Sequence, residues 1–325
     1  MKLLVTGGAG YIGSVVAAQL IEAGHEVTVL DNLRKGHRAA VSKQAQFIEA
    51  DLLNQERLTQ ILSVGFDGVL HFAALSLVGE SVQQPERYYR NNVVGTLNLL
   101  DAMRAGSVKR LVFSSTAATY GEPTEIPILE TSPTKPTNPY GGSKVAVDQM
   151  IGFEAAAHGL AAVSLRYFNV AGASGQFGEM HNPETHLIPI VLQAAAGQRE
   201  SVQIYGTDYK TSDGTAVRDY IHVEDLARAH LLALTGAKAS KHQIYNLGNG
   251  LGFSVREVIE VARKVTGIDI KAIEVERRAG DPPVLVASSA KIQSELGWRP
   301  EKAALETMIG DAWAWLQAHP KGYLE

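Results

Sequence analysis

The stretch "VTGGAGYIG" at residues 5–13 decides the fold class, because three glycines stand at fixed spacing where an apolar run gives way to a helical pattern. Gly7 would permit a tight turn, Gly10 would let the backbone approach a pyrophosphate, and Gly13 would let a helix pack close to a sheet. The first N–H groups of that helix would then face the phosphates. The stretch therefore predicts a dinucleotide-binding strand, turn and helix.

Outward from this stretch, short apolar runs alternate with longer helical patterns. Strands are expected at 2–6, 26–31, 46–50, 67–72, 109–115 and 161–167, and helices at 12–23, 92–105 and 140–158. This alternation is typical of a parallel sheet with crossover helices. After residue 168 it weakens, although residues 242–248 resemble one more strand.

We therefore expect an α/β fold: a doubly wound parallel (Rossmann) sheet with a smaller, interleaved C-terminal lobe. Residues 1–168 would form the dinucleotide-binding domain, joined by the strand at 242–248, and residues 169–325 would mainly form the substrate lobe. Ligands of such sheets bind beyond the carboxyl ends of the strands, so the cleft should lie between the two parts.

Composition excludes several classes of function. The 325 residues include no cysteine, which rules out disulfides, cysteine nucleophiles and thiolate metal sites, and no metal site is expected. The net charge of −4 comes without a basic run, so a nucleic-acid partner is not expected. No apolar run approaches the roughly 18 residues of a membrane span, which favours a cytoplasmic protein without a membrane partner.

Asp31 ends the second expected strand, where a carboxylate would accept both ribose hydroxyls of an adenosine. A 2′-phosphate would meet like charge there, so NAD is favoured over NADP, although Arg34 and Lys35 lie close by. The alternative is that Asp31 only forms the turn after the strand. His71, in an apolar setting, is interpreted as a packed histidine rather than a base.

The stretch "NPYGGSK" at 138–144 places Tyr140 and Lys144 one helical turn apart, on one face of a helix. A solvated Tyr and Lys pair is the usual alternative. Beside a dinucleotide, however, a cation about 4 Å away could lower a phenol pKa by about three units, since about 4 kcal/mol is available at that distance. Tyr140 would then serve as a base, assisted by the Thr116 hydroxyl at the end of "FSST".

A series of further phrases supports a family assignment: "LDNL", "VGESV", "YYRNNVVGT", "LRYFNVAGA", "DGTAVRDYIHVEDLA", "YNLGNG", "RRAGD" and "HPKGY". With the two stretches above, they resemble the extended short-chain dehydrogenase/reductase family, and within it the UDP-hexose 4-epimerases. The resemblance covers nearly the whole chain. It implies a bound NAD, a UDP-hexose substrate, and a homodimer built from the helices near 87–105 and 140–158.

The resemblance also implies a reaction. UDP-glucose and UDP-galactose would be interconverted by transient oxidation at C4, rotation of the tethered 4-keto sugar, and return of the hydride from tightly bound NAD. Tyr140 would be the base, Lys144 its electrostatic partner and Thr116 the hydroxyl beside them. Cofactor contacts are implied at Gly7, Gly10, Tyr11, Ile12, Gly13, Asp31, Asn32, Asp51, Leu52, Phe72, Ala73, Ala74, Asn91, Tyr140 and Lys144.

For the UDP-sugar, the resemblance implies Asn169, Arg218 and Arg278 at the diphosphate and Asp281 at the uridine ribose. Further substrate contacts are implied at His186, Leu187, Gln203, Tyr205 and Leu285, together with Thr116 and Tyr140. Two positions depart from the family: some relatives carry a Lys where Ser76 stands, and Asn is common at the position of His186. A surface ion pair with Asp219 is the alternative for Arg218.

Four other functions are alternatives, and this chain lacks the acidic groups that the first two require. Sugar-nucleotide dehydratases carry an Asp–Glu pair where this chain has Ala117 and Ala118, and UDP-glucuronate decarboxylases place a Glu at the second position. A 4-epimerase of another UDP-sugar, acetylated or pentose, is a nearer alternative. A non-catalytic NAD-binding sensor is a remote one, because Tyr140, Lys144 and Thr116 are all present.

Overall fold

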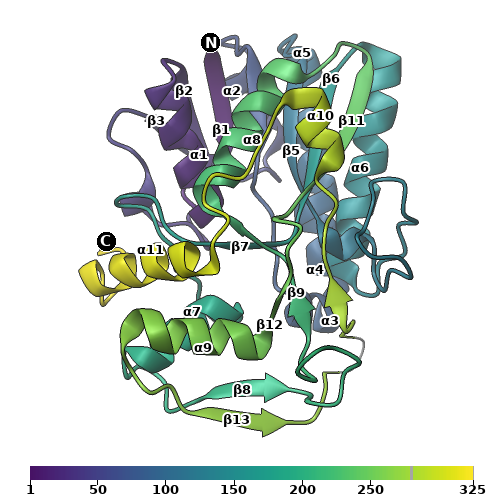
Figure 1. The fold of residues 1–325 in the computed structure, drawn as a ribbon. Helices are drawn as coiled ribbons and strands as arrows, with labels where there is room; N and C mark the ends of the chain where they lie inside the picture. Colours follow the sequence, from purple (N-terminus) through teal and green to yellow (C-terminus); the bar gives the residue numbers. More distant parts are fainter. Residues whose placement is uncertain (279–280, 325) are drawn as a thin grey trace.

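The computed structural model describes residues 1–278 and 281–324 (Figure 1). Ala279 and Gly280 of the "RRAGD" phrase, and Glu325, lie outside the described residues. The two parts expected from the sequence are visible: a helix-covered sheet and, beneath it in Figure 1, a lobe of short strands and helices.

The main sheet is parallel and runs in the order β11-β6-β5-β4-β1-β2-β3 within the described residues. Its strands are β1 (Lys2–Thr6), β2 (Glu26–Asp31), β3 (Gln46–Glu49), β4 (Gly68–His71), β5 (Arg110–Thr116), β6 (Ala161–Tyr167) and β11 (Lys241–Leu247). The order reverses at β1, which pairs with β2 on one side and β4 on the other. Such a reversal opens a crevice at the carboxyl ends of the strands, where a dinucleotide binds.

Helices cover both faces of the sheet through two apolar cores. One core packs α1 (Tyr11–Glu22), α8 (Val223–Gly236) and α10 (Ala290–Leu296) against the sheet, and the other packs α2 (Gln55–Leu62), α5 (Gly95–Ala105) and α6 (Pro139–His158). Fully buried strands such as β1 read as continuous apolar runs because side chains on both faces are covered.

The chain between β4 and α5 is irregular and helical. It contains α3 (Val78–Gln83), α4 (Pro85–Tyr88) and the π-helix η2 (Tyr89–Val94). Two single 3-10 turns, η1 (Arg38–Ala40) and η3 (Ala117–Thr119), follow β2 and β5. The sequence predicted one regular helix from residue 92, whereas the structure has a wider π turn up to Val94 and regular α-helix only from Gly95.

The lobe has its own apolar core, centred on α7 (Leu187–Ala195), α9 (Val255–Thr266) and α11 (Leu305–Ala318). Its strands are short: β7 (Asn169–Ala171) with β10 (Tyr220–His222), β8 (Val202–Tyr205) with β13 (Ala272–Val275), and β9 (Val217–Arg218) between β12 (Phe253–Ser254) and β14 (Val284–Leu285). The sequence did not predict these strands, since two to four residues give no periodicity. Besides β11, helices α8 and α10 also return to the sheet, so the lobe is interleaved with it.

Candidate active site

The glycine turn closes tightly on the segment after β4. Gly7 has a positive φ of 73°, and a Cβ at this position would overlap the backbone of Ala73. A Cβ on Gly10 would instead meet only the Gly7 carbonyl oxygen, at 3.3 Å, among the described residues. Helix α1 begins directly after Gly10, so its first N–H groups face that open side. The turn therefore fits a pyrophosphate.

Asp31 lies at the carboxyl end of β2, beside this turn. Its carboxylate accepts hydrogen bonds from Ala9 N at 3.1 Å and Leu33 N at 2.9 Å, and burial raises its pKa against the effect of those bonds. The neighbouring basic groups point elsewhere: Arg34 pairs with Asp51 at 3.3 Å, and Lys35 donates to the Asn182 carbonyl at 2.6 Å. Asp31 is thus placed beside the turn where the sequence predicts a ribose acceptor, while Arg34 and Lys35 contact other groups.

The remaining adenosine-side candidates lie after β2, β3 and β4 and at the start of α1. Asn32 donates to Asp51 at 2.9 Å, which joins the two loops. The Leu52 side chain is buried in the core beneath α5, and Tyr11 donates its hydroxyl to the Gly172 carbonyl at 2.6 Å, so both side chains have structural contacts of their own. Ser76 and the candidates Phe72 to Ala74 follow β4.

Local sequence sets the position of Tyr140. Asn138 caps α6 by accepting from Gly141 N at 2.9 Å, and Pro139 takes the first helical position, where a missing N–H costs nothing. Tyr140 therefore lies in the first turn of α6 and Lys144 one turn later. A Cβ on Gly141 would overlap the Ala118 carbonyl oxygen, so this end of α6 packs directly against η3, next to Thr116 at the end of β5.

The Tyr140 hydroxyl is hydrogen-bonded to Thr116, which lowers its pKa, but burial outweighs this and leaves the pKa raised. The Lys144 ammonium donates to the Ser114 carbonyl at 2.7 Å and lies 6.0 Å from the centre of the Tyr140 ring. Burial lowers the pKa of Lys144 to about 7. In the protein without ligand, burial therefore opposes the charged form of both groups. The prediction that Lys144, together with the nicotinamide ring, makes Tyr140 a base concerns the NAD-bound protein and stays a prediction.

His71 is a packed histidine, as interpreted from the sequence. Its ring lies between Thr6 Oγ1 at 2.7 Å and Thr96 Oγ1 at 2.9 Å, and burial lowers its pKa to about 3. Since the Thr96 hydroxyl already donates to the Asn92 carbonyl at 2.6 Å, His71 must donate to Thr96 through Nε2–H and accept from Thr6 at Nδ1. This network therefore requires the His71 ring to be neutral.

Sequence reasoning missed Asn92, the neighbour of the cofactor candidate Asn91. Asn92 is buried in the π-helix and holds the loop after β4 through two hydrogen bonds to the Leu75 backbone, at 2.9 and 3.0 Å. It also donates to Ser143 Oγ at 3.0 Å, next to Lys144, and accepts from Asn91 at 3.0 Å. π-Helical turns often occur at functional sites. Asn92 thus fixes the cofactor-side loop to the helix that carries Tyr140.

In the lobe, Arg218 and Asp281 form an ion pair with each other. The alternative partner, Asp219, is fully buried and instead accepts backbone N–H groups of Asn249, Gly250 and Ala287. Leu285 lies beside Arg218 in register on the neighbouring strand β14. The structure therefore brings these three substrate candidates together and excludes the surface pair with Asp219.

A second group of substrate candidates lies close by. Tyr205 donates its hydroxyl to Gln203, and the Arg278 guanidinium stacks 3.9 Å from the centre of the Tyr205 ring. Arg278 and Asp281 both line a cavity of about 760 Å³, with the loop around Glu122 on its far wall. This cavity is large enough for a nucleotide-sized ligand.

The other lobe candidates are placed differently. Asn169 lies on β7, directly after β6, and Leu187 packs on the lobe core at the start of α7. His186 does not join the cavity residues. Its Nδ1 lies 2.9 Å from carboxylate oxygens of both Glu179 and Glu184, and although burial lowers the pKa of His186, the two carboxylates raise it to about 10.

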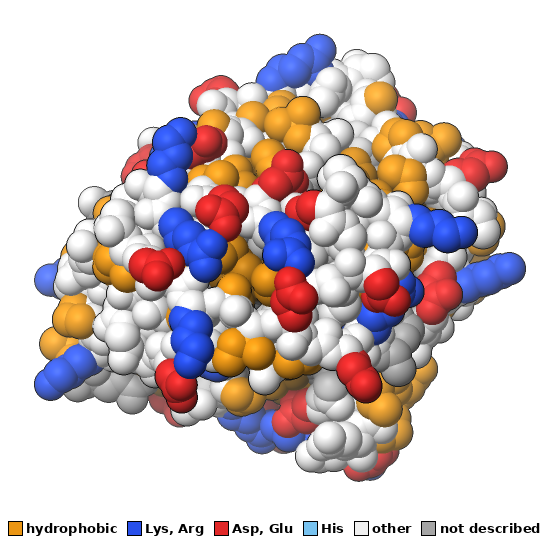
Figure 2. Space-filling model, turned by 60° about the horizontal axis from the view of Figure 1, so that its bottom comes forward, with side chains coloured by type: hydrophobic (Ala, Val, Ile, Leu, Met, Phe, Trp, Pro, Cys, Tyr) orange, Lys and Arg blue, Asp and Glu red, His pale blue; other side chains and the backbone are white. Residues whose placement is uncertain are grey.

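On the visible face of the lobe end (Figure 2), positive and negative side chains are mixed, and neither sign dominates. Figure 2 turns this end forward and shows Lys and Arg interspersed with Asp and Glu over the visible face. Among residues 1–278 and 281–324, no helix has both the length and the apolar character needed to cross a membrane.

Comparisons with known proteins agree with this geometry. The model of the NAD dependent epimerase/dehydratase family matches residues 3–248. A UDP-glucose 4-epimerase of Streptomyces lividans is 59% identical over 99% of this chain and 98% of its own length.

Two solved structures are also similar. That of UDP-glucose 4-epimerase from Brucella ovis in complex with NAD is 45% identical, has a TM-score of 0.93 and covers 96% of this chain and 97% of its own. The Bifidobacterium longum enzyme in complex with NAD+ and UDP is 37% identical, with a TM-score of 0.94, over 99% and 100% of the two chains.

Proposed function

This chain belongs to the NAD dependent epimerase/dehydratase family, and from that premise we propose that it interconverts UDP-glucose and UDP-galactose with tightly bound NAD. It is an NAD-dependent isomerase of the extended short-chain dehydrogenase/reductase fold. The observation that carries the proposal is the placement of Tyr140 against Thr116, at the sheet edge that also holds the glycine turn and Asp31.

The glycine turn, Asp31 and the loop after β4 would hold NAD, which supplies reversible acceptance of hydride from C4 of the hexose. Tyr140 would take the O4 proton and return it to the same oxygen. Thr116 donates to the Tyr140 oxygen and so stabilises the phenolate that this transfer requires. Lys144, one helical turn after Tyr140, would stabilise the phenolate electrostatically and hold the nicotinamide ribose.

The lobe would hold UDP and leave the hexose free to turn. Arg218 and Arg278 suit the diphosphate because the guanidinium fork offers paired donors, and Asp281 would be released from Arg218 to accept from the ribose. Asn169, Leu187, Gln203 and Tyr205 complete this set, with His186 at its margin. Ala117 and Ala118 form the 3-10 turn after Thr116 and provide no acid for dehydration, which supports epimerisation over that alternative.

Three finer assignments belong to the same proposal: an NAD domain in residues 1–168 with a UDP-sugar lobe mainly in 169–325, a cytoplasmic location, and a homodimer. The homodimer is supported by exposed apolar side chains on η2, α5 and α6. They are those of Tyr89, Val94, Leu97 and Phe153, the last at 76% exposure. Water-exposed apolar side chains of this size favour burial against a partner.

The proposal is tested by incubating purified protein, without added NAD, with UDP-galactose, UDP-N-acetylgalactosamine and UDP-xylose in separate reactions. We expect UDP-glucose from the first and little product from the others. Conversion of only the acetylated sugar or only the pentose would show that this sugar is the substrate instead. A reaction that needs external NAD would contradict a tightly retained cofactor.

A further inference from the structure

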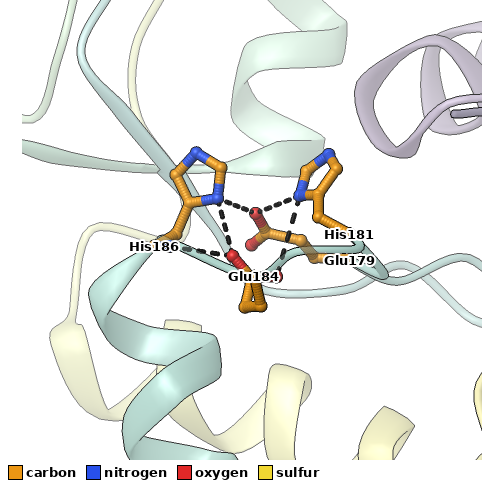
Figure 3. A group of neighbouring side chains, drawn as sticks. All are labelled: Glu179, His181, Glu184 and His186. Atoms are coloured by element: carbon orange, nitrogen blue, oxygen red, sulfur yellow. Dashed lines mark hydrogen bonds and ion pairs between the residues drawn. The ribbon is translucent and has the colours of Figure 1, made fainter. Parts of the chain in front are cut away.

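Four side chains of metal-binding types converge in one short segment that ends at the start of α7, although no metal site is expected from the sequence. They are Glu179, His181, Glu184 and His186, and their nearest ligand atoms all lie within 4.8 Å of one another (Figure 3). The spacing Glu-x-His-x-x-Glu-x-His is visible in the sequence. The absence of cysteine excludes only thiolate sites and does not exclude histidine and carboxylate ligands.

The ligand atoms are as close together as those around one metal ion, although three of the four separations are hydrogen-bond distances and would have to widen slightly. His181 Nδ1 and His186 Nδ1 lie 3.1 and 2.9 Å from Glu179 Oε1, and they lie 3.7 and 2.9 Å from the two oxygens of Glu184. A tetrahedral zinc ion with bonds of about 2.0–2.2 Å has ligand–ligand edges of about 3.4 Å. Both rings turn the same nitrogen inward toward the carboxylates, as Figure 3 shows.

From this geometry we propose that Glu179, His181, Glu184 and His186 bind one divalent transition-metal ion, with zinc as the best match. Two imidazole and two carboxylate ligands suit zinc, whereas Mg²⁺ and Ca²⁺ take oxygen ligands. Two carboxylates also neutralise the charge of the ion. The proposal does not rest on the epimerase activity.

The surroundings orient the ligands as a metal site requires. Glu184 is buried, and its Oε1 accepts from Thr185 N at 2.7 Å and His186 N at 2.8 Å, which fixes the carboxylate. The two histidine side chains keep 27% and 45% exposure, so an ion can enter from solvent.

The metal would act as a structural link between the two parts of the candidate active site. Upstream, Lys35 and His37, which follow Asp31, hydrogen-bond the Asn182 and Met180 carbonyls within this segment at 2.6 and 3.2 Å. Downstream, His186 is the N-cap of α7, directly before the substrate candidate Leu187. A bound ion would therefore fix the cofactor-side loop relative to the start of α7.

The test uses full-length, tag-free protein that has been stripped with a chelator and titrated with zinc against a chromophoric competitor. We expect one zinc per chain. His181→Gln should weaken binding by at least about 100-fold, more than the loss of a residue that only orients a ligand. The matched control is His158→Gln, which removes an exposed histidine 3.9 Å from Glu154 on α6 and should bind zinc like the wild type.

A second measurement does not depend on a variant that folds. X-ray absorption of the zinc-loaded wild type should show nitrogen and oxygen ligands at about 2.0–2.1 Å with the scattering pattern of two imidazoles. Less than stoichiometric binding by the wild type, unchanged binding by folded His181→Gln, or a spectrum without imidazole would overturn the proposal. In those cases the four side chains form only a hydrogen-bonded cluster of imidazolium and carboxylate groups.

Discussion

At the scale of single residues, the protonation of the candidate site residues depends on whether burial outweighs the effect of neighbouring charges and hydrogen bonds. Lys144, Asp31 and Tyr140 all have their pKa moved toward the neutral form by burial, and only partly back by their partners. Motif spacing predicts these three residues as site candidates. It could not give their protonation, because desolvation depends on packing by η3, β5 and α6 that spacing does not reveal.

Tyr140→Phe removes the hydroxyl that we propose exchanges a proton with O4. We expect turnover of UDP-galactose to fall by about 10²- to 10⁴-fold, the usual contribution of a positioned general base. Thr116 and Lys144 remain, so NAD content after denaturation and UDP affinity should stay near wild type. Wild-type turnover in this variant would show that Tyr140 is not the base.

His71 gives the stability of the protein a specific pH dependence. The pKa of His71 is about 3 in the folded state and near 6.5 in the unfolded state. Between these two pH values, His71 is therefore protonated in the unfolded state but neutral in the folded state. The free energy of unfolding should therefore fall as pH decreases from 6.5 toward 3, by up to about 1.4 kcal/mol per pH unit. His230, whose pKa burial lowers to about 4, adds to the same trend.

Urea denaturation between pH 5 and 7.5 checks the His71 contribution. His71→Gln should flatten the slope of unfolding free energy against pH, whatever its absolute stability, while His158→Gln at an exposed position should leave the slope unchanged. An equally steep slope in His71→Gln would show that other groups cause the dependence.

At the scale of elements, the sequence predicted the main sheet well and the lobe poorly. The limits of β1, β2, β6 and α6 agree with the predicted ones within one residue, because long buried runs and the Asn-Pro cap define them. The lobe strands β9, β12 and β14 have two residues each and exist because distant segments meet. The pairing of Arg218 with Asp281 could not be predicted for the same reason, since 63 positions separate them.

The turn between β1 and α1 should be far less tolerant of a side chain than other glycine turns. Gly7→Ala must place a methyl group in the backbone of Ala73, in addition to the strain of φ +73°. We expect loss of NAD retention and a fall in Tm. Gly24→Ala is the matched control: its φ is +82°, but a Cβ there meets nothing within 4 Å among the described residues, so only the backbone strain remains.

NAD released on denaturation and Tm measure both variants. If Gly7→Ala and Gly24→Ala behave alike, the contact with Ala73 does not limit the turn.

Strand β14 places Leu285 beside Arg218, where the resemblance puts the C2 substituent of the sugar. Leu is intermediate in bulk, so UDP-glucose and UDP-galactose should be preferred over the acetylated pair. An apolar wall discriminates by volume at about 1–3 kcal/mol per methylene, so the preference is finite. Leu285→Ala should raise kcat/KM for UDP-N-acetylglucosamine and change that for UDP-glucose much less. An unchanged ratio would show that Leu285 does not line the sugar pocket.

At the scale of the whole molecule, the apolar surface on η2, α5 and α6 predicts self-association. Arg104 on α5 pairs with Glu154 on α6 at 2.7 Å, so the two helices share one outer surface near Phe153. Burying the exposed Phe153 side chain in a dimer would contribute up to about 1.5–3 kcal/mol, and the less exposed side chains would contribute less. Wild-type protein should therefore have about twice the chain mass of 34.9 kDa by light scattering at micromolar concentration.

A charge within this surface should separate the protomers, because an unpaired carboxylate in an apolar interface is expensive. We expect Phe153→Asp with Leu97→Asp to be monomeric. Leu251→Asp changes a similarly exposed apolar residue between β11 and β12, outside the elements of this surface, and should remain dimeric. Since every residue assigned to the reaction comes from one chain, the monomer should keep turnover while its Tm falls. A monomeric wild type, or a double variant that stays dimeric, would exclude this surface as the dimer interface.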